Sequence, residues 1–191
     1  MKIAALNGSN SKNSYNLKLL NFIKRHFKDQ DIDVYPITGL PMFNENYPGG
    51  TPQSVLDLAK KIGDADAVII AVAEYNHSLT SALKSVMEWF SYQVHPLTKK
   101  PVLLVGTSSH DQGASRAQVH LRDITLSPGI YANVFQGNEF FMGREREAFD
   151  ADGNIKDPNT VKFLEQVFSD FLTFAKNNPA SKKADGGEKD D

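Results

Sequence analysis

The sequence predicts an α/β fold with a doubly wound parallel sheet and helices on both faces. A short apolar segment followed by an amphipathic helix recurs five times, which is typical of parallel sheets. Residues 67–72 and 101–105 carry no polar side chain, as expected of central strands covered on both faces. Small polar loops follow the first, third and fourth apolar segments, where a ligand site would lie in such a sheet.

The first part of the chain contains two strand–helix units. Residues 2–6 are expected to form a buried strand, and a helix over residues 17–27 follows from apolar side chains at helical spacing, namely Leu17, Leu20, Ile23 and Phe27. Residues 31–37 alternate polar and apolar side chains and are predicted as the second strand, and Pro36 indicates either an edge strand or the end of the strand. Thr51 as N-cap and Pro52 in the first turn predict a helix to Ile62, which Gly63 ends.

The rest of the chain continues the pattern. The run over residues 67–72 leads through a loop at residues 73–78 into a helix over residues 80–90. Residues 101–105 precede a polar loop and a helix over residues 115–126, and residues 130–135 are predicted as the fifth strand. Asp157 and Pro158 open a last helix to Lys176, whose predicted buried side chains are Phe163, Val167, Phe171 and Phe174.

Right-handed crossovers make the flavodoxin-like order 2-1-3-4-5 the economical topology for a five-stranded sheet of this kind. In that order the polar loops after strands one, three and four converge on a single crevice at the carboxyl ends of the strands. We expect residues 1–178 to form this domain and residues 179–191, which lack large apolar side chains, to be a disordered charged tail.

The composition excludes several classes of function. There is no cysteine, so disulfides, thiolate metal sites and cysteine nucleophiles are excluded. A net charge of −2 offers no general attraction to nucleic acid or to anionic membranes. No apolar run approaches the ~20 residues that span a bilayer, and the N-terminus lacks the layout of a secretory signal. We therefore expect a cytoplasmic protein without nucleic-acid or membrane partners.

The turn at residues 8–16 is the first candidate site. It joins a strand to a helix, and its hydroxyl and amide side chains, together with the helix N-terminus, would suit a phosphate. It contains neither a P-loop nor a dinucleotide fingerprint, since Gly8 is its only glycine. An ordinary loop in which Ser14 or a neighbour caps the helix is the alternative.

The segments after the third and fourth predicted strands are further candidates. Tyr75 could pack against a flat heteroaromatic ring and Asn76 could contact its polar edge, although a loop tyrosine packed on the next helix explains the pattern as well. His77 and His110 are expected to be solvent-facing loop histidines rather than an acid–base pair. Ser108 and Ser109 lack the G-x-S-x-G elbow of a hydrolase nucleophile.

Taken together, these segments resemble the NADPH-dependent FMN reductase family, a flavodoxin-like group that includes chromate, azo-dye and quinone reductases. The first loop is similar to the family's G-S-x-R-x-x-S-x-N, with Gly8, Ser9, Ser14 and Asn16 in place. Residues 74–76 are similar to its P-E-Y-N, residues 106–118 to its glycine-rich loop and following R-A-Q, and residues 40–44 to its L-P-x-Y-N. The resemblance extends from residue 1 to about residue 175.

The resemblance implies FMN bound without a covalent link, with NADPH or NADH as electron donor and a small-molecule acceptor. The residues implied to hold the phosphate are Ser9, Ser11, Ser14, Tyr15 and Asn16. The residues implied to line the flavin ring are Glu74, Tyr75, Asn76 and His77 on one side, and Ser108 and Ser109 on another. No catalytic side chain and no metal ligand is implied, because the flavin carries the chemistry. The resemblance also implies a homodimer or homotetramer, with the loop at Phe43 and Asn44 near a neighbour's flavin.

Several positions depart from the family pattern. Ser11 stands where the family usually has arginine, and the neighbouring Lys12 is the cation expected to take its place. Ala73 replaces the family's proline, and His77 replaces its glycine. In the third loop, Ser109 and His110 replace proline and glycine.

The function predicted is an NAD(P)H-dependent FMN oxidoreductase that passes hydride from a nicotinamide to flavin and then electrons to an acceptor such as a quinone, azo compound or free flavin. A non-enzymatic flavodoxin-like electron carrier is the first alternative, and a stable one-electron-reduced state would favour it. A flavin-free α/β binding module is the second, and failure to retain added FMN would favour it. All three share one fold, so the fold alone does not separate them.

Overall fold

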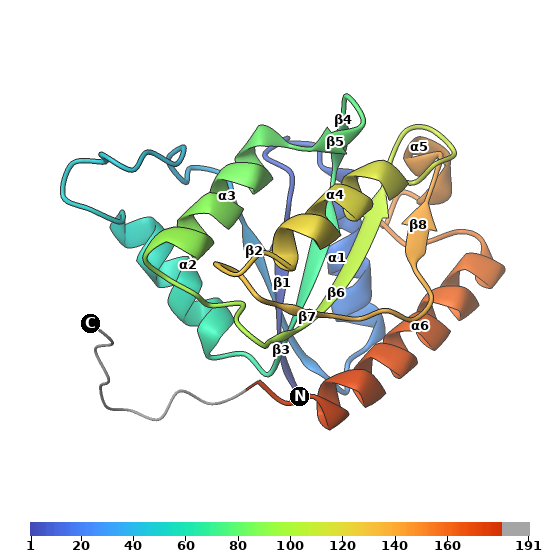
Figure 1. The fold of residues 1–191 in the computed structure, drawn as a ribbon. Helices are drawn as coiled ribbons and strands as arrows, with labels where there is room; N and C mark the ends of the chain where they lie inside the picture. The colour runs from blue at the N-terminus through green and yellow to red at the C-terminus, as the bar shows by residue number, and fades with distance from the viewer. Residues whose placement is uncertain (181–191) are drawn as a thin grey trace.

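A parallel sheet forms the centre of the protein in the computed structural model, which describes residues 1–180 (Figure 1). The strands are β1 (Lys2–Asn7), β2 (Asp31–Pro36), β3 (Ala67–Val72), β6 (Pro101–Thr107), β7 (Asn133–Val134) and β8 (Phe140–Met142). Their order is β2-β1-β3-β6-β7, with β8 also paired to β6, and every pairing is parallel. The flavodoxin-like order is confirmed, and β2 is the edge strand that Pro36 indicated. The predicted tail lies outside the described residues from residue 181 onward.

Helices cover both faces of the sheet. They are α1 (Tyr15–His26), α2 (Gln53–Gly63), α3 (Ser81–Tyr92), α4 (Ser115–Thr125), α5 (Glu145–Ala148) and α6 (Pro158–Asn177). Apolar residues of α2, α3 and α4 form one core with the sheet, and those of α1 and α6 form the other. Among the described residues, no helix is long and apolar enough to cross a membrane.

The central strand β3 shows why this arrangement is stable. All six of its residues are fully buried. Val68, Ile70 and Val72 join the core under α2, α3 and α4, whereas Ala67, Ile69 and Ala71 join the core under α1 and α6. Successive side chains of a strand point to opposite faces, so a strand without polar residues fits only between two apolar layers.

Three of the six helices in residues 1–180, namely α1, α3 and α6, start after a residue whose side chain caps the helix. The Ser14 Oγ accepts a hydrogen bond from the Leu17 N–H at 3.1 Å, and the Thr80 Oγ1 accepts one from the Leu83 N–H at 3.0 Å. The prediction that Thr51 caps α2 was wrong, because that helix starts at Gln53 and its N-cap is Pro52. The Thr51 hydroxyl instead donates to the Gln93 Oε1 at 2.6 Å.

The buried face of α6 differs from the prediction. Phe163 is 43% exposed and Phe174 is half-buried. The fully buried stripe begins one residue later, and it consists of Leu164, Val167, Phe168, Phe171 and Ala175. One residue is about 100° around a helix, so this shift turns Phe163 to the margin, where its ring stacks against Phe140 with centroids 6.2 Å apart.

The predicted fifth strand over residues 130–135 is wrong in its extent. Only Asn133 and Val134 form β7, which pairs with the start of β6, and β8 then pairs with the end of β6. Tyr131 has a φ of +48°, which is not a strand conformation. Its carbonyl accepts from the Lys99 N–H at 2.7 Å, so it belongs to the turn after α4. The sheet therefore has six strands rather than the predicted five.

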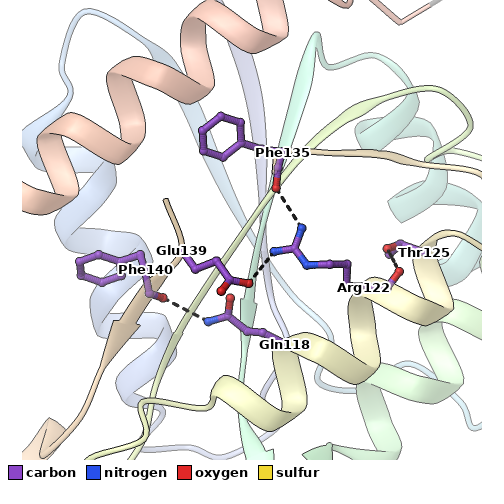
Figure 2. A network of polar contacts seen from close by, with 6 residues as sticks. All are labelled: Gln118, Arg122, Thr125, Phe135, Glu139 and Phe140. Atoms are coloured by element: carbon purple, nitrogen blue, oxygen red, sulfur yellow. Dashed lines mark hydrogen bonds and ion pairs between the residues drawn. The ribbon is translucent and has the colours of Figure 1, made fainter. Parts of the chain in front are cut away.

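Side chains of α4 hold the segment between β7 and β8 in place, as Figure 2 shows. Gln118 donates to the Phe140 carbonyl at 3.1 Å. Arg122 donates to the Phe135 carbonyl and to the Glu139 carboxylate, each at 3.0 Å. These bonds hold the two carbonyls and the carboxylate against α4, and they fix where the chain re-enters the sheet at β8.

Candidate active site

A cavity of about 530 Å³ opens at the carboxyl edge of the sheet, as expected from the topology. The loops after β1, β3 and β6 all line it, so the predicted convergence of the three polar loops is confirmed. The residues proposed from the sequence that line this cavity are Ser9, Ser11, Ser14, Tyr15, Asn16, Glu74, Tyr75, Asn76, His77, Ser108 and Ser109. The structure thus brings together every residue of that prediction.

Asn7 organises the first loop, a role that the sequence analysis missed. Its Oδ1 accepts from the Ser9 N–H at 3.3 Å and from the Ser14 hydroxyl at 3.2 Å, and its Nδ2 donates to the Ser9 carbonyl at 3.0 Å. Gly8 lets the loop lie against β3, since a Cβ there would lie 2.6 Å from the Ala71 carbonyl oxygen. The loop is therefore held rigidly while the start of α1 faces the cavity.

The side chain of Asn16 is engaged within the protein. Its Nδ2 donates to the Thr107 carbonyl at 3.3 Å, and its Oδ1 accepts from the Thr107 N–H at 3.1 Å. This pair of bonds ties the start of α1 to the end of β6, and both residues are buried. The N–H groups of Tyr15 and Asn16, the first two residues of α1, have no acceptor one turn earlier and remain available to an anion, whereas the Leu17 N–H is taken by the Ser14 hydroxyl.

Residues 74–79, expected to be loop up to residue 78, form a small hairpin. Its antiparallel strands are β4 (Glu74–Tyr75) and β5 (Ser78–Leu79), joined by Asn76 and His77. Both turn residues have positive φ, +50° and +65°, as two-residue hairpin turns require. The family's glycine at the second position suits this conformation, whereas His77 adopts it at a cost of about 1 kcal/mol.

The Glu74 side chain is buried against α4 and is not exposed on the surface of the hairpin. It is 4% exposed, and its Oε2 accepts from the Ala117 N–H at 3.3 Å. The Arg116 guanidinium lies 3.7 Å from the other carboxylate oxygen. The N-cap of α4, Ala114, offers no side-chain oxygen, so Glu74 supplies the carboxylate that caps this helix.

The third loop is also ordered by polar contacts. The Ser108 hydroxyl donates to the His110 carbonyl at 2.9 Å, and the Ser108 N–H donates to the Met142 carbonyl at 3.1 Å. Asp111 pairs with Arg144 at 2.6 Å, and that guanidinium lowers the pKa of the carboxyl. Asp111 is therefore not a partner for His110, and both His77 and His110 are exposed, as expected from the sequence.

Seven residues outside the predicted set also line the cavity, among them Thr107, Glu145 and Arg146. Thr107 is 1% exposed, and within the described residues its hydroxyl has no hydrogen-bond partner, although the Glu145 carboxyl lies close by. Burial raises the pKa of Glu145, while Arg146 and the Thr107 hydroxyl oppose that rise. Glu145 and Arg146 lie more than 125 residues after the first loop, so no local pattern placed them there.

A larger concavity of about 960 Å³ lies at the opposite edge of the sheet. Lys100 lines this concavity, and its ammonium donates hydrogen bonds to the Gly63 and Ala65 carbonyls at 2.8 and 2.5 Å. Burial lowers the pKa of Lys100, with Asp66 and Asp64 opposing that change. The lysine thus satisfies carbonyls at the end of α2, and the converging loops are all at the other edge.

Comparison with known proteins agrees with this geometry. The family model for NADPH-dependent FMN reductase matches residues 1–147. The chain belongs to this family. It is 42% identical over 175 residues to the NADH:(hydroxy)cinnamate reductase subunit CrdA of Vibrio ruber, an alignment covering 91% of this chain and 87% of that protein. It is 40% identical over 181 residues to NADH-dependent flavin reductase subunit 2 of Lactobacillus johnsonii, covering 91% and 97%.

A solved structure leads to the same family. FerB, a flavoenzyme NAD(P)H:(acceptor) oxidoreductase from Paracoccus denitrificans, superposes with a TM-score of 0.83 at 28% identity, covering 94% of this chain and 99% of that one. The family assignment made from the sequence is confirmed. The protein is an oxidoreductase, and FMN and NAD(P)H are the cofactors of its family.

The residues present fit FMN. The start of α1 offers unpaired N–H groups and the hydroxyls of Ser9 and Ser11 to a phosphate. Arg146 adds a full positive charge to the lining. Tyr75 is 58% exposed and gives a flat ring an aromatic surface at the rim.

Proposed function

We propose that this cavity holds FMN and that the protein uses it to carry electrons from NAD(P)H to a small-molecule acceptor. The phosphate is assigned to the loop at residues 9–16, and the ring to the β4–β5 hairpin and Ser108 and Ser109. When bound, FMN supplies the hydride-accepting centre. The cavity is open enough for a nicotinamide and an acceptor to use it in turn, which predicts ping-pong kinetics.

One observation carries this proposal. The loops after β1, β3 and β6, which carry the three family motifs, line one cavity together with the start of α1. This lining combines hydroxyl and amide groups with one guanidinium and the exposed ring of Tyr75, and these groups suit a phosphate, a hydroxylated chain and a flat ring.

The protein's own residues bind and orient the cofactor. Asn7 and Asn16 hold the phosphate loop, and Glu74 holds the hairpin against α4. No side chain is assigned as a general acid or base, because the cofactor provides the reactive atoms. Rigid support of this kind lowers the cost of placing a ring for hydride transfer.

The acceptor class is the finer part of the proposal. One relative is named a (hydroxy)cinnamate reductase subunit and another a flavin reductase subunit. We assign a small planar acceptor to this chain, such as a quinone, an azo compound or a free flavin. The exposed Tyr75 at the rim supports this class, because planar molecules pack well on aromatic faces.

The oligomeric state and location remain predictions from the sequence. The loop at Phe43 and Asn44 packs on its own α3, where the Phe43 ring meets Trp89 at 4.9 Å and the Phe43 N–H donates to the Ser85 hydroxyl at 2.6 Å. Asn44 and Met42 are exposed and free to meet a second subunit. A homodimer or homotetramer is proposed on that basis and on the family resemblance, and a cytoplasmic location is proposed from the sequence pattern alone.

A visible absorbance spectrum tests the proposal directly. Protein incubated with FMN and freed of excess should keep flavin absorbance, and anaerobic NADH or NADPH should bleach it in one two-electron step. Retained absorbance that neither nucleotide bleaches would favour the electron carrier. No retained flavin at micromolar protein would contradict the assignment of the site.

A further inference from the structure

We infer that Arg146 supplies the positive charge that binds the phosphate of FMN in this cavity. This inference rests on the proposed function, since it assigns a residue to the proposed FMN site. Ser11 lines the cavity without bringing a charge to it. Lys12, the substitute expected from the sequence, is not part of the lining, whereas Arg146 is; both side chains are exposed.

The fold brings Arg146 to the first loop. Strand β8 runs parallel to β6 toward the carboxyl edge of the sheet, and α5 follows immediately. Arg146 on α5 then lines the same cavity as Ser11, Asn13 and Tyr15. Phe149, buried just after α5, stacks against the Tyr15 ring with centroids 6.2 Å apart. These contacts hold α5 beside the start of α1.

The other cations near the cavity are paired or do not line it, so the phosphate is assigned to Arg146. This residue is the one lysine or arginine among the residues that line the cavity. Arg144 pairs with Asp111, Arg116 lies beside Glu74, and the Lys18 ammonium lies over the Tyr15 ring at 4.4 Å. Within residues 1–180, Arg146 takes part in no ion pair shorter than 4.0 Å.

A guanidinium suits this position for physical reasons. The helix end contributes about half a positive charge, whereas the phosphate carries close to two negative charges at neutral pH. Glu145 places a carboxyl in the same cavity, which makes an additional cation more necessary. A planar guanidinium donates two parallel hydrogen bonds to phosphate oxygens, a geometry that the ammonium group of a lysine does not provide.

Binding of FMN and of riboflavin, which lacks the phosphate, isolates this contribution. We expect Arg146→Gln to weaken FMN binding about 10- to 100-fold, the range for one lost charge-assisted hydrogen-bonding group. Riboflavin affinity should stay within about twofold, because its binding energy does not include the phosphate. Flavin fluorescence quenching measures both dissociation constants without any turnover.

Two controls and one rescue sharpen the result. Arg144→Gln removes the same charge two positions earlier but outside the cavity, and Lys12→Gln removes the cation next to Ser11. Both should keep the wild-type preference for FMN over riboflavin. Adding Ser11→Arg to Arg146→Gln should restore that preference, because a guanidinium returns to the same cavity.

The outcomes separate this inference from the function proposed above. Wild-type protein that binds neither flavin would contradict the site itself. Wild-type protein that prefers FMN, with an unchanged preference in Arg146→Gln or a lost preference in Lys12→Gln, would overturn the role of Arg146 alone. An equal loss for FMN and riboflavin in Arg146→Gln would also overturn it, because that result indicates a general disturbance of the cavity.

Discussion

The buried carboxylate of Glu74 accepts a hydrogen bond from the backbone N–H of Ala117, 3.3 Å away. This contact caps α4 from a hairpin that lies more than 40 residues earlier in the chain. It also fixes the hairpin that lines the cavity, so stability and site geometry depend on the same side chain.

We expect Glu74→Ala to lower the free energy of unfolding by about 1–2 kcal/mol, because α4 loses its cap and a buried N–H loses its acceptor. Urea denaturation of the flavin-free protein measures this effect. Glu88→Ala is the matched control, since its exposed pair with Lys84 should be worth less than about 0.5 kcal/mol. Equal effects of the two substitutions would contradict the capping role.

Replacing His77 by glycine should stabilise the flavin-free protein by about 0.5–1 kcal/mol, because glycine adopts a φ of +65° without the strain that histidine bears. Asn76→Gly is the control, and it should change stability less, because asparagine tolerates the left-handed region better than histidine. Thermal unfolding followed by circular dichroism compares the two. A lower melting temperature for His77→Gly would show that its side chain makes stabilising contacts that outweigh the strain.

Asn16→Ala should destabilise the protein by about 2–3 kcal/mol, since both backbone groups of buried Thr107 would lose their side-chain partner. Ser11→Ala, at an exposed position in the same loop, should have little effect on the flavin-free protein. Chemical denaturation measures both changes. Similar values for the two variants would mean that the link between α1 and β6 does not contribute to stability.

The raised pKa of Glu145 predicts a pH-dependent difference between wild type and Glu145→Gln. The native state holds the proton more tightly than the unfolded chain, so the carboxyl favours the native state most at pH values below its ordinary pKa. This contribution is lost as pH rises through the native pKa. Glu145→Gln should therefore gain stability over wild type between about pH 4 and pH 7. Melting temperatures of the two flavin-free proteins across that range measure the effect, and a constant difference would contradict it.

Much of the fold follows from local patterns. Ala67–Val72 is apolar throughout and became the central strand. Ser14 caps α1, as one interpretation of its loop expected, and Thr80, predicted to begin a helix, is the N-cap of α3. The motif residues were predictable because each follows a strand, and parallel strands deliver their carboxyl ends to one edge. Family resemblance in those segments then indicated the cofactor.

The missed features depend on contacts between distant parts of the chain. Arg122 and Gln118 hold the segment between β7 and β8, and nothing near residue 130 indicates that the predicted fifth strand is short or that a further strand follows it (Figure 2). The β4–β5 hairpin is two residues long on each side and has histidine where glycine would have indicated its turn. Short elements of this kind are set by their surroundings rather than by propensity.

The sequence by itself therefore determined the layers, the strand order and which loops meet, because hydrophobic periodicity and capping act over a few residues. Only the tertiary structure decided that Glu74 caps α4, that Asn16 binds Thr107, and that Arg146 enters the cavity where Ser11 lacks a charge. Each of these contacts joins residues that are far apart in the sequence, and the packing of the helices on the sheet determines which of them come together.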